Sequence, residues 1–143
     1  MVTEKAHADG AFHWPVRVYY EDTDAQGLVY FANYFKYMER ARTEWLRARG
    51  IEQDRLRAED NRLFVVVDTG ARFLVPARFN DELWVSVELE GIARASFQMT
   101  QEIRRGGADG ELLCTGTTRA ACITADSYRP ARLPRVLLEV STG

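Results

Sequence analysis

The chain has 143 residues, of which 46% are hydrophobic and 28% are charged, and its net charge is −2. This is the size and composition of one folded domain. No run of about 18 apolar residues occurs, so we predict no membrane-spanning helix, and the lack of a basic block argues against nucleic acid as the main partner. We expect residues 1–12, which lack the apolar region of a secretory signal, to be a flexible lead-in, and residues 13–141 to form one domain of a cytoplasmic protein.

The cysteines and histidines predict neither a disulfide nor a metal site. Cys114 and Cys122 lie in one predicted extended segment. At about 3.3 Å per residue, their Cα atoms would be about 26 Å apart, far beyond the limit of about 7 Å for a disulfide. The histidines, His7 and His13, complete no ligand spacing typical of zinc.

The first part of the chain predicts a strand followed by one long helix. Residues 13–20 (HWPVRVYY) are β-branched and aromatic, as strands prefer, and a turn-type cluster (EDTDAQG) follows. Within residues 28–50 the period changes to spacings of three and four, which are typical of a helix that ends at Gly50. The residues at these spacings are Phe31, Phe35, Met38, Arg42 and Trp45.

The second part of the chain alternates with a period of two, which predicts strands. The expected strands are 63–69, 71–75, 83–90, 96–103 and 111–125. Short turns and no crossover helices join them, so they should pair antiparallel, and residues 133–140 predict a last helical turn or an edge strand. Because a sheet with one apolar face must be covered, we predict an α+β fold with the long helix packed on about five strands.

The junction between the first strand and the helix carries acidic residues that fit several functions. The simplest is capping, in which an Asp or Thr satisfies the free amides of the helix start. A calcium loop is the second, since Asp22, Asp24, Gln26 and Gly27 match an EF-hand loop apart from the neutral Gln, but Asn33 stands where the bidentate Glu belongs. A phosphatase Asp-x-Asp is the third, and it needs alternating strands and helices.

The fourth possibility is catalysis without a metal. A carboxylate beside a helix N-terminus is stabilised as the anion, and the amides there can hold a carbonyl oxygen while negative charge develops on it. A carboxylate and amide donors together form a minimal site for acyl hydrolysis. Neither histidine lies in a convincing setting for a Ser-His-Asp triad.

Residues 18–47 (VYYEDTDAQGLVYFANYFKYMERARTEWLR), supported by residues 71–83 (ARFLVPARFNDEL), carry a family pattern. They resemble the 4-hydroxybenzoyl-CoA thioesterase family of hotdog-fold proteins, and most nearly its Tol-Pal-associated acyl-CoA thioesterase branch. Residues 93–97 and 128–134 add weaker support. The resemblance implies a long helix wrapped by an antiparallel sheet, and homodimers or homotetramers with active sites at subunit interfaces. It also implies an acyl-CoA substrate, whose CoA is part of the substrate, and no cofactor or metal.

The resemblance also implies roles for particular residues. Asp24 falls on the catalytic aspartate, as nucleophile or general base, and Gly27 on the glycine that lets the chain turn into the helix. Phe31 falls where a backbone N–H polarises the thioester oxygen. The residues implied to bind the CoA phosphates are Arg94, Ser96, Arg129 and Arg132, and those near the acyl group are Phe64 and Val67.

One departure from the family pattern concerns position 31, where many members of the branch carry His and this chain carries Phe. If the backbone amide is the essential group, the ring identity is tolerable, and Phe favours an apolar acyl pocket. The resemblance leaves open a non-catalytic module that binds acyl-CoA or acyl carrier protein. Hydratase chemistry on the same fold would usually want a His beside the acid, and none is evident here.

Overall fold

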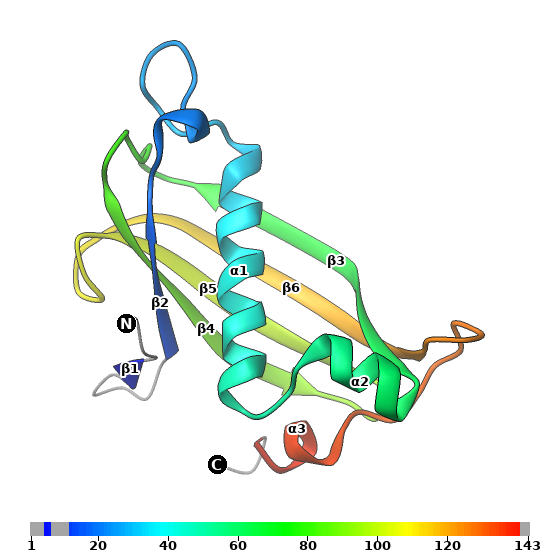
Figure 1. Ribbon diagram of the computed structural model, residues 1–143. Helices are drawn as coiled ribbons and strands as arrows, with labels where there is room; N and C mark the ends of the chain where they lie inside the picture. The colour runs from blue at the N-terminus through cyan, green and yellow to red at the C-terminus, as the bar shows by residue number, and fades with distance from the viewer. Residues whose placement is uncertain (1–4, 7–11, 141–143) are drawn as a thin grey trace.

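The apolar alternation of the strands forms one antiparallel sheet, and the periodic helix lies across one face of it (Figure 1). The computed structural model describes residues 5–6 and 12–140. Its elements are β1 (Lys5–Ala6), β2 (Phe12–Arg17), the 3-10 turn η1 (Tyr20–Asp22), α1 (Ala32–Ala48), α2 (Gln53–Asp60), β3 (Arg62–Phe73), β4 (Glu82–Ile92), β5 (Ser96–Arg105), β6 (Glu111–Thr124) and α3 (Arg135–Val140).

The sheet has the order β1-β2-β4-β5-β6-β3, and every neighbouring pair of strands runs antiparallel. The five long strands, β2 to β6, confirm the predicted sheet, and β1 adds two residues at its edge. A long helix held against a curved antiparallel sheet is the hotdog arrangement that the resemblance implies. The predicted α+β hotdog fold is therefore confirmed.

The core lies between α1 and the sheet. The helix buries Tyr37, Met38 and Trp45, and the sheet buries Phe97 and Ile103 opposite them. Burial of the apolar surface of each such side chain contributes about 1.5–3 kcal/mol to the stability of the folded state.

One charged residue is part of this interface. The Arg42 guanidinium donates to Gln101 Oε1 at 3.0 Å and to Thr118 Oγ1 at 3.4 Å, and Gln101 Nε2 donates to the Met38 carbonyl at 3.1 Å. Burial lowers the pKa of Arg42. These bonds explain why a charged residue occupies the inner face of a helix predicted from its apolar spacing.

Two details differ from the sequence prediction, and a third decides between two predicted alternatives. A second helix, α2, was not expected, because Leu56 is the one residue that it buries and so it shows no apolar stripe. Residues 63–69 and 71–75 were expected to be two strands, but β3 is continuous through Gly70, with a bulge at Val67. At the end of the chain, α3 resolves the choice between a helical turn and an edge strand in favour of the helix.

The expected lead-in is described only in part. Lys5–Ala6 pair with β2, which begins at Phe12, one residue before the predicted start of the domain. Residues 1–4, 7–11 and 141–143 lie outside the described residues. Within the described part of the chain, no helix combines the length and the apolar character that crossing a membrane requires.

Both cysteines lie in β6, are fully buried and are free thiols. Burial raises the pKa of Cys114 to about 11 and also raises the pKa of Cys122. The thiolate is the reactive form of cysteine, so the raised pKa values disfavour reaction, and the burial of both sulfur atoms keeps a reagent away from them. We expect a thiol reagent such as Ellman's reagent to modify neither cysteine in the native protein at pH 8, and both after unfolding in guanidinium. Rapid modification of the native protein would contradict the described burial.

Candidate active site

A short hairpin lies between η1 and α1 and carries Asp24 at its tip. Thr23 and Val29 form an antiparallel bridge. Inside it, the Asp24 N–H donates to the Leu28 carbonyl at 2.8 Å, and the Gly27 N–H donates to the Asp24 carbonyl at 3.0 Å. The turn-type cluster of the sequence is thus a closed loop with its own hydrogen bonds.

The carboxylate of Asp24 is oriented by this loop. Its Oδ1 accepts the N–H groups of Gln26 at 2.9 Å and Leu28 at 3.2 Å, an arrangement that Asp favours in turns. No described residue donates a hydrogen bond to Oδ2. The side chain is exposed in the single chain, so one carboxylate oxygen is held and the other can meet a substrate.

Gly27 makes the loop possible. Its φ of +80° lies in the left-handed region, which costs residues with a Cβ about 1–2 kcal/mol. Gly27 thus lies in the turn that precedes the helix, and its expected role of letting the chain turn there stays a prediction.

The start of α1 offers backbone donors. Phe31 is the N-cap and has no side-chain cap, so neither Asp22 nor Asp24 caps this helix. The N–H of Asn33 donates to the Tyr30 carbonyl, whereas the N–H groups of Phe31 and Ala32 donate to no acceptor among residues 5–6 and 12–140. Unsatisfied amides at a helix start attract an oxygen that carries partial negative charge.

A loop far along the chain, residues 76–81, holds the hairpin against the helix. The Ala77 N–H donates to the Tyr34 hydroxyl at 3.0 Å, and the Ala77 carbonyl accepts the N–H of Val29 at 2.9 Å. Arg105 anchors this loop by donating to the Asp81 carboxylate at 2.9 Å and to the Pro76 carbonyl at 2.6 Å. Sequence reasoning linked residues 71–83 to the family but did not find these contacts, because they join segments more than twenty residues apart.

Aromatic side chains surround the helix start. Phe31 is 55% exposed and contacts the rings of Tyr30 and Phe73, with ring centroids 4.9 and 6.3 Å apart. Phe73, at the end of β3, is 47% exposed and also meets Phe35. The carboxylate, the amides and an apolar surface therefore lie at one end of the molecule.

The residues expected to bind CoA lie at the opposite end of α1. Arg94 is in the β4–β5 turn, and its carbonyl accepts the N–H of Leu133, next to Arg132. Ser96 begins β5, and Arg129 lies in the loop after β6. Figure 1 shows the β4–β5 turn and the loop after β6 at the end of the molecule opposite the start of α1. Since α1 has 17 residues, about 26 Å of helix separate its two ends. The structure brings these four residues near one another but not near Asp24 of the same chain.

The residues expected near the acyl group lie along β3. Phe64 packs edge-to-face on Phe97, with ring centroids 5.3 Å apart, and lines a cavity of about 150 Å³ beside Arg42. Val67 is the bulged residue and is exposed. Phe73 lies nine positions after Phe64 in β3, which is about 30 Å along the strand. Within one chain, the aromatic residue of β3 that contacts Phe31 is therefore Phe73. Sequence reasoning did not predict this residue.

Two of the alternatives for the acidic junction do not fit this geometry. The segment before Asp22 is strand β2 followed by a 3-10 turn, so an EF-hand pair of helices is not formed. The sheet is antiparallel throughout, unlike the alternating folds that carry a phosphatase Asp-x-Asp. Among the described residues, no three His, Cys, Asp or Glu side chains lie together as a metal site requires.

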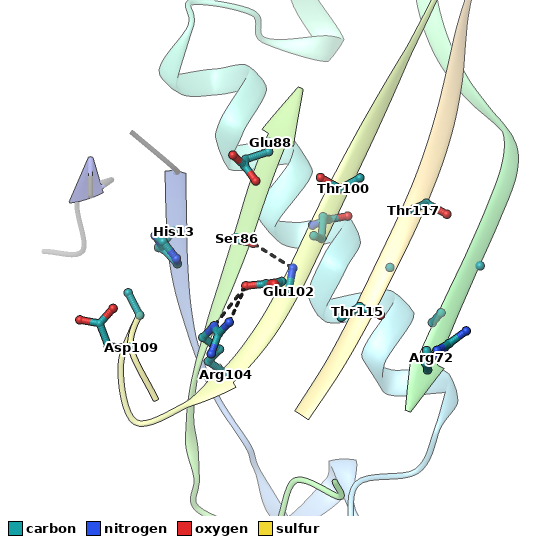
Figure 2. Close-up of a pocket in the computed structure, with 15 residues that line it drawn as sticks. His13, Arg72, Ser86, Glu88, Thr100, Glu102, Arg104, Asp109, Thr115 and Thr117 are labelled. Carbon is teal, nitrogen blue, oxygen red and sulfur yellow. Dashed lines mark hydrogen bonds and ion pairs between the residues drawn. The ribbon is translucent and has the colours of Figure 1, made fainter. Parts of the chain in front are cut away.

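The face of the sheet turned away from α1 carries a hollow of about 810 Å³ (Figure 2). Polar side chains from five strands line it, including Ser86, Thr100 and Thr117. Glu102 and Arg104 pair within it at 3.0 Å. None of the residues expected in the catalytic or binding site lines this hollow, so it is separate from the end that carries Asp24.

A sequence model of the thioesterase-like superfamily matches residues 18–140. The chain belongs to this superfamily. It is 37% identical over 127 residues to the acyl-CoA thioesterase YbgC of Haemophilus influenzae, which covers 89% of the chain and 91% of the relative. It is 39% identical to the acyl-CoA thioester hydrolase YbgC of Shigella flexneri, over 89% of the chain and 92% of the relative.

Solved structures agree with the assignment to the thioesterase-like superfamily. Slr0204, a 1,4-dihydroxy-2-naphthoyl-CoA thioesterase from Synechocystis, superposes with a TM-score of 0.82 at 25% identity, over 90% of this chain and 93% of that one. The superfamily match begins at residue 18 and so includes the Asp24 hairpin, α1 and loop 76–81.

The hairpin of this thioesterase-like protein should be sensitive to a side chain at position 27 because of its backbone conformation. A Cβ built on Gly27 or on Gly107 meets no atom within 4 Å, but only Gly27 of the two has a positive φ. We expect Gly27→Ala to lower the free energy of unfolding by about 1–2 kcal/mol, and Gly107→Ala to leave it unchanged or raise it slightly. Urea unfolding of both variants measures this, and equal effects would contradict a strained hairpin.

Proposed function

We propose that Asp24 and the amides of Phe31 and Ala32 form the catalytic centre of an acyl-CoA thioesterase. The enzyme class rests on membership of the superfamily and on relatives named as acyl-CoA thioesterases that align over most of the chain. The observation that carries the site is the hairpin, which holds one oxygen of Asp24 and leaves the other exposed at the end of the molecule where α1 begins.

The chemistry follows from this arrangement. The thioester carbonyl oxygen accepts hydrogen bonds from the helix amides, which stabilise the charge that develops on it. As a nucleophile, the Asp24 carboxylate attacks the carbonyl carbon, the C–S bond breaks and CoA leaves, and water then hydrolyses the resulting anhydride. As a general base, Asp24 instead takes a proton from the attacking water, and that proton ends on the sulfur of CoA. Both routes yield free acid and CoA.

A second copy of the chain completes the site. The Asp24 end of one subunit lacks the arginines expected to bind the CoA phosphates, which lie at the far end of α1. An antiparallel partner placed along β3 would bring its Arg94, Arg129 and Arg132 beside that Asp24. Val66 and Val67 of β3 are 51% and 47% exposed, and this strand is at the edge of the described sheet, where long edges need protection.

The finer assignments stay predictions. Membership of the 4-hydroxybenzoyl-CoA branch with a Tol-Pal association and catalysis without a cofactor rest on the resemblance. The cytoplasmic location rests on the first residues of the sequence, which lack the apolar region of a secretory signal. A homotetramer would need a second contact surface besides β3. The acyl group, delivered by CoA or by an acyl carrier protein, would meet the apolar surface around Phe31.

Replacement of Asp24 by Asn tests the catalytic centre. Asp24→Asn keeps the size of the side chain and an oxygen that can accept the Gln26 and Leu28 amides, but removes the charge. We expect turnover of a panel of acyl-CoA substrates, measured by release of the CoA thiol, to fall by at least about a thousandfold, while the protein stays folded and binds acyl-CoA. Asp22→Asn is a matched control in the same segment and should keep most of the turnover.

An Asp24→Asn variant that retains most of its activity would remove the proposed mechanism. If the wild-type protein binds acyl-CoA but releases no thiol from any member of the panel, the protein is a binding module rather than an enzyme.

The proposed dimer can be tested at the edge of the sheet. Val66→Lys places a charge on the exposed apolar part of β3, where burial without a partner is costly. We expect sedimentation to show a monomer and thiol release to fall by about tenfold or more. Ala58→Lys, on the exposed side of α2, adds the same charge elsewhere and should change neither. A fully active monomer would contradict a site shared between subunits.

A further inference from the structure

The side chain of Asn33 links the first turn of α1 to the base of the Asp24 hairpin. Its Nδ2 donates to the Asp22 carbonyl at 2.8 Å. The same carbonyl accepts the N–H of Tyr30 at 3.0 Å, so both of its lone pairs are used. Asn33 is half-buried, so water competes poorly for this hydrogen bond.

The other backbone hydrogen bonds of the hairpin do not attach this side of it to the helix, and the Asp22 carboxylate lies beside the Tyr37 hydroxyl of α1, where burial and this carboxylate raise the pKa of Tyr37. The Thr23–Val29 bridge and the bonds between Asp24 and Leu28 close the loop upon itself. The contact through Ala77 to Tyr34 restrains the strand that contains Val29. The segment that leads into Asp24 is connected to α1 at Asp22. This connection includes the hydrogen bond from the Asn33 side chain to the Asp22 carbonyl.

We infer that Asn33 is a positioning residue, whose amide sets the distance between the Asp24 carboxylate and the amides of Phe31 and Ala32. The inference rests on the proposed function. Attack on a carbonyl requires the reacting atoms to be held about 3–3.5 Å apart, and a misplacement of about 1 Å costs about a hundredfold in rate. Asn33 touches neither substrate nor reacting atoms and acts through the hairpin.

Two substitutions test this role. Asn33→Ala removes the side-chain donor, and Asn33→Asp keeps the shape but replaces the donor with an acceptor that faces the Asp22 carbonyl. We expect kcat for acyl-CoA to fall about tenfold to a hundredfold in both, while KM and the affinity for a non-hydrolysable S-alkyl-CoA thioether stay within about twofold. A negative charge in the first turn stabilises a helix, so Asn33→Asp should not weaken α1. A loss of activity in this variant therefore cannot be caused by a less stable helix.

Lys36→Ala is the matched control, because Lys36 is exposed one turn further along the same helix and its side chain makes no hydrogen bond to residues 5–6 or 12–140. It should keep the wild-type kcat.

Amide hydrogen exchange gives a second measurement that does not depend on activity. The N–H groups of Gln26 and Leu28 are bonded to the Asp24 carboxylate, so their protection reports whether the hairpin keeps its shape. We expect both amides to exchange at least about threefold faster in Asn33→Ala than in the wild type, and at unchanged rates in Lys36→Ala.

The possible results separate this inference from the proposed function. If Asp24→Asn is inactive but Asn33→Ala keeps kcat within about twofold, Asn33 does not position the site and the inference fails. If the activity of Asn33→Ala falls only as much as its fraction of folded protein, Asn33 has a structural role alone and the inference also fails. If Asp24→Asn is itself active, the proposed function fails first.

Discussion

The two hydrogen bonds that Asp24 Oδ1 accepts from Gln26 and Leu28 are the constraint on which the proposed catalytic site depends. They hold a carboxylate at the tip of a short hairpin in one orientation. The hairpin in turn needs the positive φ of Gly27 and the loop that Arg105 anchors. Nearly all of these restraints involve the backbone, so the carboxylate is positioned by the path of the chain rather than by neighbouring charges.

The second constraint is the length of α1, which separates the carboxylate from the arginines expected to bind CoA. In the proposed dimer, one chain of this thioesterase would therefore supply the reacting end of one site and the phosphate-binding end of the other. The exposed edge of β3 and the exposed rings of Phe31 and Phe73 lie where a partner and an acyl group would cover them. Association and catalysis would then depend on the same surface.

Much of the fold could be predicted from the sequence because its signals are local. The period of α1 is visible in Met38 and Trp45, and the alternation of β4 and β5 is equally regular. The α2 helix could not be found in this way, since Leu56 alone is buried, and Gly70 suggested a break in a strand that continues through it.

The candidate site likewise has parts that local sequence patterns predict and parts that depend on contacts between distant segments. Asp24, Gly27 and Phe31 are neighbours in sequence, so their placement in one segment before the helix could be predicted. Seven residues separate Asp24 from α1. The contact that holds this segment to the helix, in which the Tyr34 hydroxyl accepts the Ala77 N–H, is long-range, and no local pattern in the sequence predicts it. For the same reason, the sequence could not show that Arg94 and Asp24 lie at opposite ends of one chain.

A crystal structure of the full-length Asp24→Asn variant with an intact acyl-CoA tests the central claim most directly. The account predicts that the thioester oxygen lies about 2.7–3.1 Å from the amide nitrogen of Phe31 or Ala32. The side chain at position 24 should then face the carbonyl carbon, and the CoA phosphates should contact arginines of the partner subunit. A thioester bound away from the start of α1, for example in the polar hollow on the other face of the sheet, would contradict it.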